Sequence, residues 1–115
     1  LLGWSYKAEV GDPRETPAEP LAETLLSKGV KVGTWDPHID FSEYPEGVEV
    51  ISDIADAIGY DIAVLVTAHK ACLNLDWEQL LNQMRTPLIY DGRRVLNLES
   101  LQNSGWQTYA VGKPV

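Results

Sequence analysis

The residues Ile62-Ala63-Val64-Leu65-Val66 form an unbroken apolar run in the middle of the chain. Such a run is typical of a strand that is covered on both faces, as in a parallel sheet, because a strand with one wet face alternates apolar and polar residues. Parallel neighbours need crossover connections, which helices usually supply. The run therefore predicts an α/β fold in which residues 62–66 form a strand between two helical layers.

The segment before this run predicts a helix followed by a strand. Thr16 and Glu19 have the spacing of a capping box, and Pro17 suits the first helical position. Apolar residues then recur at helical spacing up to Gly29, which favours the left-handed conformation that ends many helices. We therefore expect a helix over residues 16–28, and the apolar residues after Gly29 predict a strand over 30–35.

Strands and helices alternate along the rest of the chain. Further strands are expected at residues 48–51, 87–90 and 106–111. Further helices are expected between a Ser52 cap and Gly59, from Asp76 onward, and over residues 97–104. This alternation predicts a three-layer α/β domain with one open, mainly parallel sheet of about five strands and helices on both faces.

The first strand is unusually short. Only Leu1 and Leu2 precede Gly3, whereas a strand usually has about five or six residues. We therefore expect that the first strand is truncated and that the chain is a fragment of a longer polypeptide.

Composition and charge narrow the class of protein. The chain has 115 residues, of which 44% are hydrophobic and 23% charged, as expected for one globular domain over residues 1–115. No stretch is apolar enough for a membrane helix, and the N-terminal residues lack the pattern of a signal peptide. The formal net charge of -8 argues against broad binding to nucleic acid or to anionic membranes, since both need a positive surface.

Cys72 is the single cysteine and forms no disulfide within the chain, which is typical of a reducing compartment such as the cytoplasm. His69 lies three residues before it, but two such residues do not complete a metal shell, which takes three or four protein ligands. The sequence therefore predicts a packed thiol and no metal site, and it indicates no partner for His38.

Basic residues follow several of the predicted strands. In an open α/β sheet, ligands bind beyond the carboxyl ends of the strands, near the point where strand order reverses. With the strand order 2-1-3-4-5, the loops over residues 3–15, 67–75 and 91–94 lie at this edge. Two of these loops carry four of the nine basic residues: Lys7, Arg14, Arg93 and Arg94. Such a cluster suits an anion of the size of a diphosphate.

A structural role is the alternative for part of this cluster. Arg14 and Arg94 have acidic neighbours with which they could pair to hold the loops: Asp12, Glu15 and Asp91. Exposed ion pairs of this kind are common and contribute little to stability. The residues alone leave both interpretations open.

The first loop does not have the sequence of a dinucleotide-binding turn. Asp36 ends a predicted strand, where such domains place the acid that binds ribose, but Gly3 is followed by Trp4-Ser5-Tyr6. The pyrophosphate approaches the backbone closely only where the glycines of G-x-G-x-x-G are present. We therefore expect no NAD binding by this chain and interpret Asp36 as a loop-forming residue. Trp4 and Tyr6 are candidates for stacking on a base.

Several short motifs occur in a fixed order across essentially the whole chain. They are Leu2-Gly3-Trp4-Ser5-Tyr6-Lys7, Asp12-Pro13-Arg14-Glu15-Thr16-Pro17-Ala18, Asp36-Pro37, Asp76-Trp77-Glu78-Gln79-Leu80, Asp91-Gly92-Arg93-Arg94-Val95-Leu96, Gly105-Trp106 and Val111-Gly112-Lys113. As an ordered set they resemble the C-terminal, nucleotide-binding domain of the UDP-glucose/GDP-mannose dehydrogenase family. The resemblance implies a Rossmann-like domain that holds the UDP part of a UDP-sugar.

The resemblance also implies a larger enzyme. The family oxidises the 6-position of a UDP-sugar twice with NAD and forms a uronic acid, so UDP-glucose or a UDP-N-acetylhexosamine is the expected substrate. The family's NAD-binding domain, linker helix and catalytic cysteine and lysine lie upstream of this domain. Cys72 matches none of the catalytic positions, so no catalytic residue is expected here, and the parent protein is expected to be a homo-oligomer.

Individual roles follow from the same resemblance. The aromatic-lysine pair that contacts the UDP-sugar falls on Tyr6 and Lys7, and the first arginine of the Asp-Gly-Arg motif falls on Arg93. Support of the loops and of the domain interface is expected from the neighbouring charged residues: Asp12, Arg14, Glu15, Asp91 and Arg94. The sequence departs from the family pattern at two places. Gly11 stands where the family often has an aspartate, and Trp4-Ser5 where it usually has Leu-Ala, so the identity of the sugar stays open.

A second hypothesis belongs to a different class. The chain could be a stand-alone α/β interaction or regulatory module whose basic edge binds a protein and no nucleotide. A titration with UDP distinguishes the two, because only the first predicts saturable changes around Tyr6, Lys7 and Arg93.

Overall fold

The computed structural model describes residues 1–12, 14, 16–40 and 44–112. In chain order the elements are α1 (Ala18–Ser27), β1 (Gly33–Thr34), β2 (Glu49–Val50), the 3-10 helix η2 (Ile54–Asp56), β3 (Ala63–Leu65), α2 (Lys70–Leu73), α3 (Trp77–Gln83), β4 (Leu88–Asp91), α4 (Leu98–Asn103) and β5 (Gln107–Ala110). Strands β1, β2, β3 and β5 are present but shorter than predicted, whereas β4 has the expected length and is shifted by one residue. Helix α2 lies in a segment that we expected to be a loop. No described helix is long and apolar enough to cross a membrane.

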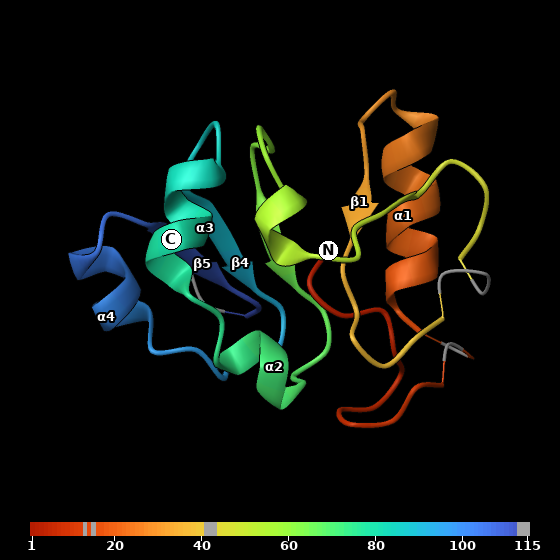
Figure 1. Ribbon diagram of the computed structural model, residues 1–115, viewed down its shortest axis with the longest axis horizontal. Coiled ribbons are helices and arrows are strands. Elements are labelled where there is room, and N and C mark those ends of the chain that lie inside the picture. Colours follow the sequence, from red (N-terminus) through yellow and green to blue (C-terminus); the bar gives the residue numbers. More distant parts are fainter. Residues whose placement is uncertain (13, 15, 41–43, 113–115) are drawn as a thin grey trace.

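The five strands form two parallel sheets that meet at the N-terminus. Strands β3, β4 and β5 pair in that order, and β1 pairs with β2. Leu2 forms a parallel bridge to Trp35 on one side and to Leu65 on the other. Residues 1–3 thus take the place of a strand between the two sheets, and Figure 1 shows the N-terminus at this position. The expected strand order is confirmed, with β2 added outside β1.

Hydrogen bonds show how completely residues 1–3 act as a strand. The amides of Leu2 and Gly3 donate to Val64 and Trp35, respectively, over 2.7 and 2.8 Å. In return, the carbonyl of Leu2 accepts from the amide of Val66 over 2.9 Å. These bonds hold the two sheets together, because a strand in the middle of a sheet satisfies the backbone groups of both neighbours.

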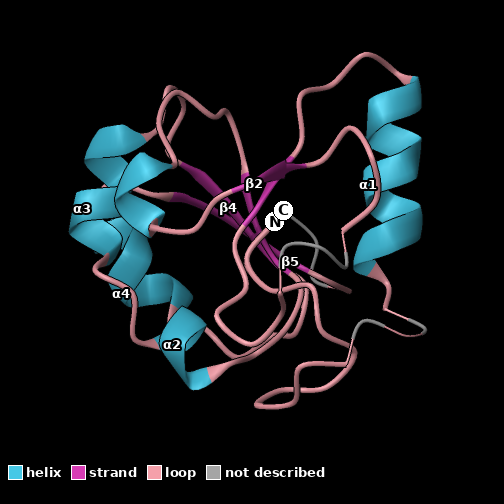
Figure 2. Cartoon of the chain, turned by 45° about the vertical axis from the view of Figure 1, so that its right-hand side comes forward, coloured by secondary structure: helices cyan, strands magenta, loops and turns pink. Residues whose placement is uncertain are grey.

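The strands lie between two helical layers, as expected for a three-layer α/β fold. Figure 2 shows α1 on one side of the strands and α2, α3 and α4 on the other. Leu65 packs in the core cluster with Leu80 from α3, whereas Val66 packs in the other cluster with Ala22 from α1. Successive side chains of a strand point to opposite faces, so the apolar run at residues 62–66 supplies both cores.

Two of the helix starts differ from the predictions. Ala18, not Pro17, is the first residue of α1, although the Thr16 hydroxyl does accept a hydrogen bond from the Ala18 amide over 3.2 Å. Asp53, not Ser52, caps η2, because its carboxylate accepts from the amide of Ala55. Carboxylates and hydroxyls both serve as N-caps, so the sequence pattern located these starts only to within one residue.

Candidate functional site

Three loops meet at the carboxyl ends of the strands. The Thr67 hydroxyl donates to the carbonyl of Ser5 over 2.6 Å, which joins the loop after β3 to the first loop. The Arg93 Nε–H donates to the carbonyl of Val66 over 2.6 Å, which joins the loop after β4 to the end of β3. The prediction that residues 3–15, 67–75 and 91–94 lie at one edge is thereby confirmed for the described residues.

The first loop turns away from the sheet at Gly3. Its φ is +92°, and a Cβ built at this position would lie 2.5 Å from the Cβ of Thr67. Only glycine combines a left-handed φ with so close an approach to a neighbouring segment. Gly3 therefore lets the first loop cross directly above the end of β3.

Asp36 anchors the first loop from the end of the β1 segment. Its Oδ2 accepts hydrogen bonds from the amides of Trp4 and Ser5, from the Ser5 hydroxyl and from His69 Nε2, at 2.6 to 2.9 Å. Its Oδ1 accepts from the amide of His38 over 2.8 Å. Burial alone would raise the pKa of Asp36, but these hydrogen bonds outweigh it and hold the pKa below its usual value. Asp36 is therefore a loop-forming residue, as expected. It acts as a buried carboxylate that holds the first loop and the loop after β1 in place.

His69, which lies three residues before Cys72 in the sequence, has Asp36 and Glu9 as its hydrogen-bond partners. Its side chain is fully buried, with Nε2 directed to Asp36 and Nδ1 accepting from the backbone amide of Glu9 over 2.8 Å. The carboxylate of Glu9 lies 2.8 Å from His38 Nε2. Partial desolvation raises the pKa of Glu9, but hydrogen bonds from the Lys70 amide and from His38 lower it overall. No local sequence spacing pointed to this group of residues.

Tyr6 and Lys7 project from the anchored loop into solvent. Tyr6 is 43% exposed, while its amide donates to the carbonyl of Asp12 over 2.8 Å. The Nζ of Lys7 lies 5.9 Å from the centre of the Tyr6 ring. The loop thus has a fixed backbone, and the aromatic ring and the ammonium group are together at its surface.

Arg14 pairs with Asp12 in the way that the structural alternative anticipated. Its Nε and Nη2 donate to the two carboxylate oxygens of Asp12 over 3.0 and 2.9 Å. The Arg14 guanidinium holds the pKa of Asp12 well below its usual range, at about 2. The pair closes the loop locally. Glu15, which we expected to support the same loop, lies outside the described residues.

Asp91 shapes the loop that carries the other two arginines. Its carboxylate is fully buried and accepts from the backbone amides of Arg93, Val95 and Leu96 over 2.8 to 2.9 Å. Asp91 and Arg94, both described residues, form no ion pair with each other. Arg94 has a left-handed φ of 56° and is exposed. Neither Arg93 nor Arg94 forms an ion pair with any residue in the described part of the chain.

The first loop lacks the features of a dinucleotide-binding turn. Trp4 is only 1% exposed and packs edge-on against Tyr44, so the expectation that it stacks on a base is wrong. The first loop lacks the glycines that the pyrophosphate needs, and the protein's own donors occupy the carboxylate of Asp36. We therefore assign no NAD contact to these residues.

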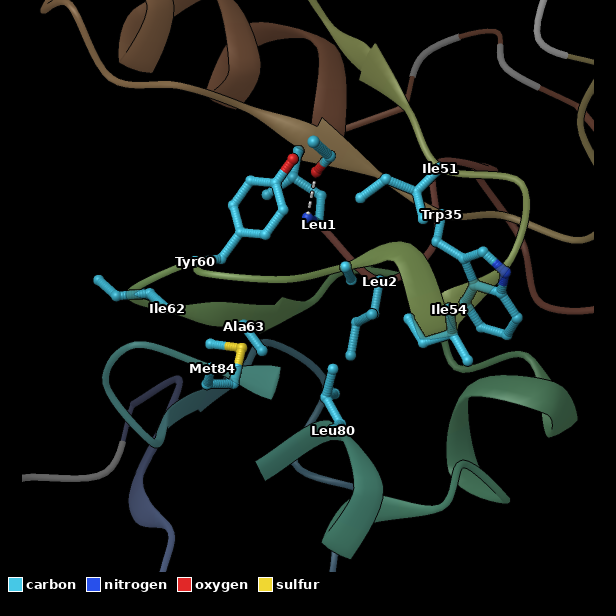
Figure 3. Close-up of a pocket in the computed structure, with 12 residues that line it drawn as sticks. Leu1, Leu2, Trp35, Ile51, Ile54, Tyr60, Ile62, Ala63, Leu80 and Met84 are labelled. Carbon is cyan, nitrogen blue, oxygen red and sulfur yellow. Dashed lines mark hydrogen bonds between the residues drawn. The ribbon is translucent and has the colours of Figure 1, made fainter. Parts of the chain in front are cut away.

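Two apolar cavities among the described residues lie away from the basic edge. A cavity of about 40 Å³ lies beside residues 1–2, and Figure 3 shows that Leu80, Met84, Tyr60 and Ile62 line it. A groove of about 850 Å³ lies at the amino ends of the strands, between α1 and β3. Neither is lined by Tyr6, Lys7 or Arg93. The basic edge is therefore separate from these two cavities.

Comparison with known proteins identifies the family of the chain. Residues 1–98 match the model of the UDP-glucose/GDP-mannose dehydrogenase family, UDP binding domain. The chain belongs to this family. It is 31% identical over its full length to a UDP-glucose 6-dehydrogenase of Rickettsia conorii, of which it covers 28%. It is 29% identical over 97% of its length to a UDP-N-acetyl-D-mannosamine dehydrogenase of Methanococcus maripaludis, of which it covers 26%.

Solved structures of the family share the fold. The crystal structure of an NDP-N-acetyl-D-galactosaminuronic acid dehydrogenase from Methanosarcina mazei aligns with 97% of this chain at a TM-score of 0.85 and 27% identity. The chain covers 24% of that structure. It therefore spans about a quarter of the length of the dehydrogenases it matches and corresponds to their UDP-binding domain.

Proposed function

We propose that this chain binds the UDP part of a UDP-sugar through Tyr6, Lys7 and Arg93, as one domain of an NAD-dependent UDP-sugar 6-dehydrogenase. The observation that carries the proposal is that the loops holding these residues meet at the carboxyl edge of the sheet in a chain that matches the family's UDP-binding domain.

The charges at this edge support binding of a diphosphate. Lys7 and Arg93 have no carboxylate partner among the described residues, whereas Arg14 is neutralised by Asp12. The Nε–H of Arg93 is already used by the Val66 carbonyl, which leaves its Nη groups to face a ligand. On a chain with a net charge of -8, these two cations, which form no ion pair within the described residues, favour binding of a diphosphate at this edge.

The rest of the enzyme completes the reaction in this proposal. NAD would supply the hydride acceptor, and other domains of the parent chain would bind it, because the described residues do not fit it. The catalytic groups would likewise lie outside this chain, so the isolated chain is not expected to turn over. Relatives named for UDP-glucose and for UDP-N-acetylmannosamine match about equally well, so the proposal covers both sugars.

We include two further features in the proposal. The parent enzyme is a homo-oligomer, held together largely by parts outside this chain. It works in the cytoplasm, where a free thiol such as the buried Cys72 stays reduced.

The proposal is tested by titrating the isotope-labelled chain with UDP, uridine and pyrophosphate and following the amide signals by NMR. We expect saturable shifts at residues 5–8 and 91–94 with UDP, weaker ones with pyrophosphate, and the weakest with uridine. Lys7→Ala should reduce the affinity for UDP, whereas the matched control Lys28→Ala, which removes an exposed lysine near the end of α1, should not. Absence of any saturable shift would favour the protein-interaction module instead.

A further inference from the structure

We propose that Glu9, His38 and His69 form a binding site for a divalent transition-metal ion of the Zn²⁺ type. Glu9 Oε2 lies 2.8 Å from His38 Nε2 and 3.6 Å from His69 Nδ1. The three side chains each offer one ligand atom, and these atoms lie within 4.8 Å of one another. Two imidazoles and one carboxylate are a ligand set that zinc uses in sites with an open fourth position.

Asp36 orients His69 for this role. Because Nδ1 accepts a hydrogen bond from the Glu9 amide, it has no proton, and the proton of the ring is on Nε2, which donates to Asp36. The lone pair of His69 therefore faces Glu9 and His38. A ligating histidine typically donates its other N–H to a carboxylate in this way, which fixes the ring and raises its basicity. His69 and Asp36 are both fully buried, so this orientation is rigid.

The other two ligands lie at the surface. The side chains of Glu9 and His38 are 38% and 36% exposed, so an ion can reach the site, and water can complete its coordination shell. Glu9 has a left-handed φ of 63°. To bind a metal, the backbone amide of Glu9 must leave Nδ1 of His69. We therefore expect metal binding to move the peptide between residues 8 and 9.

The ligand set also predicts selectivity. Imidazole nitrogens favour zinc, cobalt, nickel and copper ions, whereas magnesium and calcium prefer sites made of oxygen atoms only. Cys72 is a separate, fully buried thiol outside this group of ligand atoms. A site built as proposed therefore binds Zn²⁺ and Co²⁺ through nitrogen and oxygen, without a thiolate.

Binding would connect three segments of the chain. Glu9 belongs to the loop that carries Tyr6 and Lys7, His38 follows the β1 segment, and His69 precedes α2. An ion that binds the folded chain alone also stabilises it, and Zn²⁺ at about 100 times its Kd should raise the Tm of a domain of this size by roughly 10 °C.

The proposal is tested with the full chain, free of any affinity tag, because the chain has only two histidines of its own. Zn²⁺ is titrated by calorimetry, and Co²⁺ is followed by its visible absorption. We expect one ion per chain with a micromolar or lower Kd, visible bands typical of tetrahedral Co²⁺, and no sulfur-to-cobalt band in the near ultraviolet.

Variants decide whether these residues are the ligands. His38→Gln and Glu9→Gln should each weaken Zn²⁺ binding at least tenfold, while Glu78→Gln, an exposed glutamate on α3, should leave it unchanged. Circular dichroism checks that each variant is folded. Binding that survives His38→Gln, no saturable binding of Zn²⁺, or equally strong binding of Mg²⁺ would overturn the proposal. None of these outcomes affects the UDP titration, which is carried out with a chelator present.

Discussion

His69 Nε2 lies 2.9 Å from Asp36 Oδ2, and neither side chain is exposed to solvent. The same oxygen of Asp36 accepts the amides of Trp4 and Ser5. This one carboxylate therefore holds the first loop against the end of β1 and fixes the ring of His69. Because so many donors converge on a buried charge, its removal leaves several of them without a partner.

Replacement of Asp36 by asparagine should destabilise the fold. Asp36→Asn removes the charge and places an NH₂ group where a carboxylate oxygen now accepts, so we expect a loss of about 2–4 kcal/mol in the free energy of unfolding. Asp56→Asn, at an exposed position in η2, is the matched control and should change it by less than about 0.5 kcal/mol. Urea denaturation measures both. Equal effects of the two variants would show that the buried carboxylate is not a major contributor.

The same carboxylate should make stability depend on pH. The pKa of Asp36 in the folded protein is below its usual value of 3.8, so its contribution is present above about pH 4 and is lost as the pH falls through the folded pKa. The difference in unfolding free energy between the wild type and Asp36→Asn should therefore narrow as the pH falls from about 4 through the folded pKa. A difference that stays constant over this range would contradict the assignment.

Substitutions at Gly3 and Gly29 distinguish the cost of backbone strain from the cost of a steric clash. Both have a left-handed φ, but a Cβ at Gly29 would meet nothing within 4 Å, whereas one at Gly3 would collide with Thr67. Gly29→Ala should cost about 1 kcal/mol, and Gly3→Ala about 3 kcal/mol or more, because a backbone shift is added. Thermal and urea unfolding measure the difference. Similar costs would mean that the first loop moves freely away from Thr67.

Arg93 and Arg94 should contribute unequally to UDP binding. A hydrogen bond to a charged group contributes about 1.5–3 kcal/mol, so Arg93→Ala should weaken binding by roughly one to two orders of magnitude. Arg94→Ala should reduce the affinity less, because successive residues at the end of a strand point to opposite sides and Arg94 adopts a left-handed φ of 56°. NMR titration at low salt compares the two, and the Tm of each variant shows whether the lost Arg93–Val66 bond affects the fold. A larger loss for Arg94 would refute the residue assignment without affecting the family membership.

Cys72 should be unreactive in the folded chain. Burial raises the pKa of its thiol to about 12, so almost no thiolate is present at neutral pH. Labelling with a thiol-specific disulfide reagent at pH 8 should therefore be much slower in buffer than in urea, by at least about 100-fold. Rapid labelling of the folded chain would show that the cluster around Cys72 opens readily.

The arrangement of the elements was predictable because its causes are local. The apolar run at residues 62–66, the helix around residues 18–27 and the alternation that follows each depend on neighbours within a few positions. Chain direction and crossover geometry then limit how parallel strands are ordered. The motifs shared with the dehydrogenase family are also readable along the chain, as the match over residues 1–98 confirms.

Contacts between distant loops were decided only by the tertiary structure. Glu9 meets His69 across 60 positions and His38 across 29, and Asp36 meets Trp4 across 32. No spacing along the chain encodes such pairs. They form because several parallel strands end at one edge, and the loops that follow must share the small space above it. Trp4 is a further example, because its position in a loop favoured contact with a ligand. In the structure its amide donates to Asp36, and its ring is buried in the core beside α1.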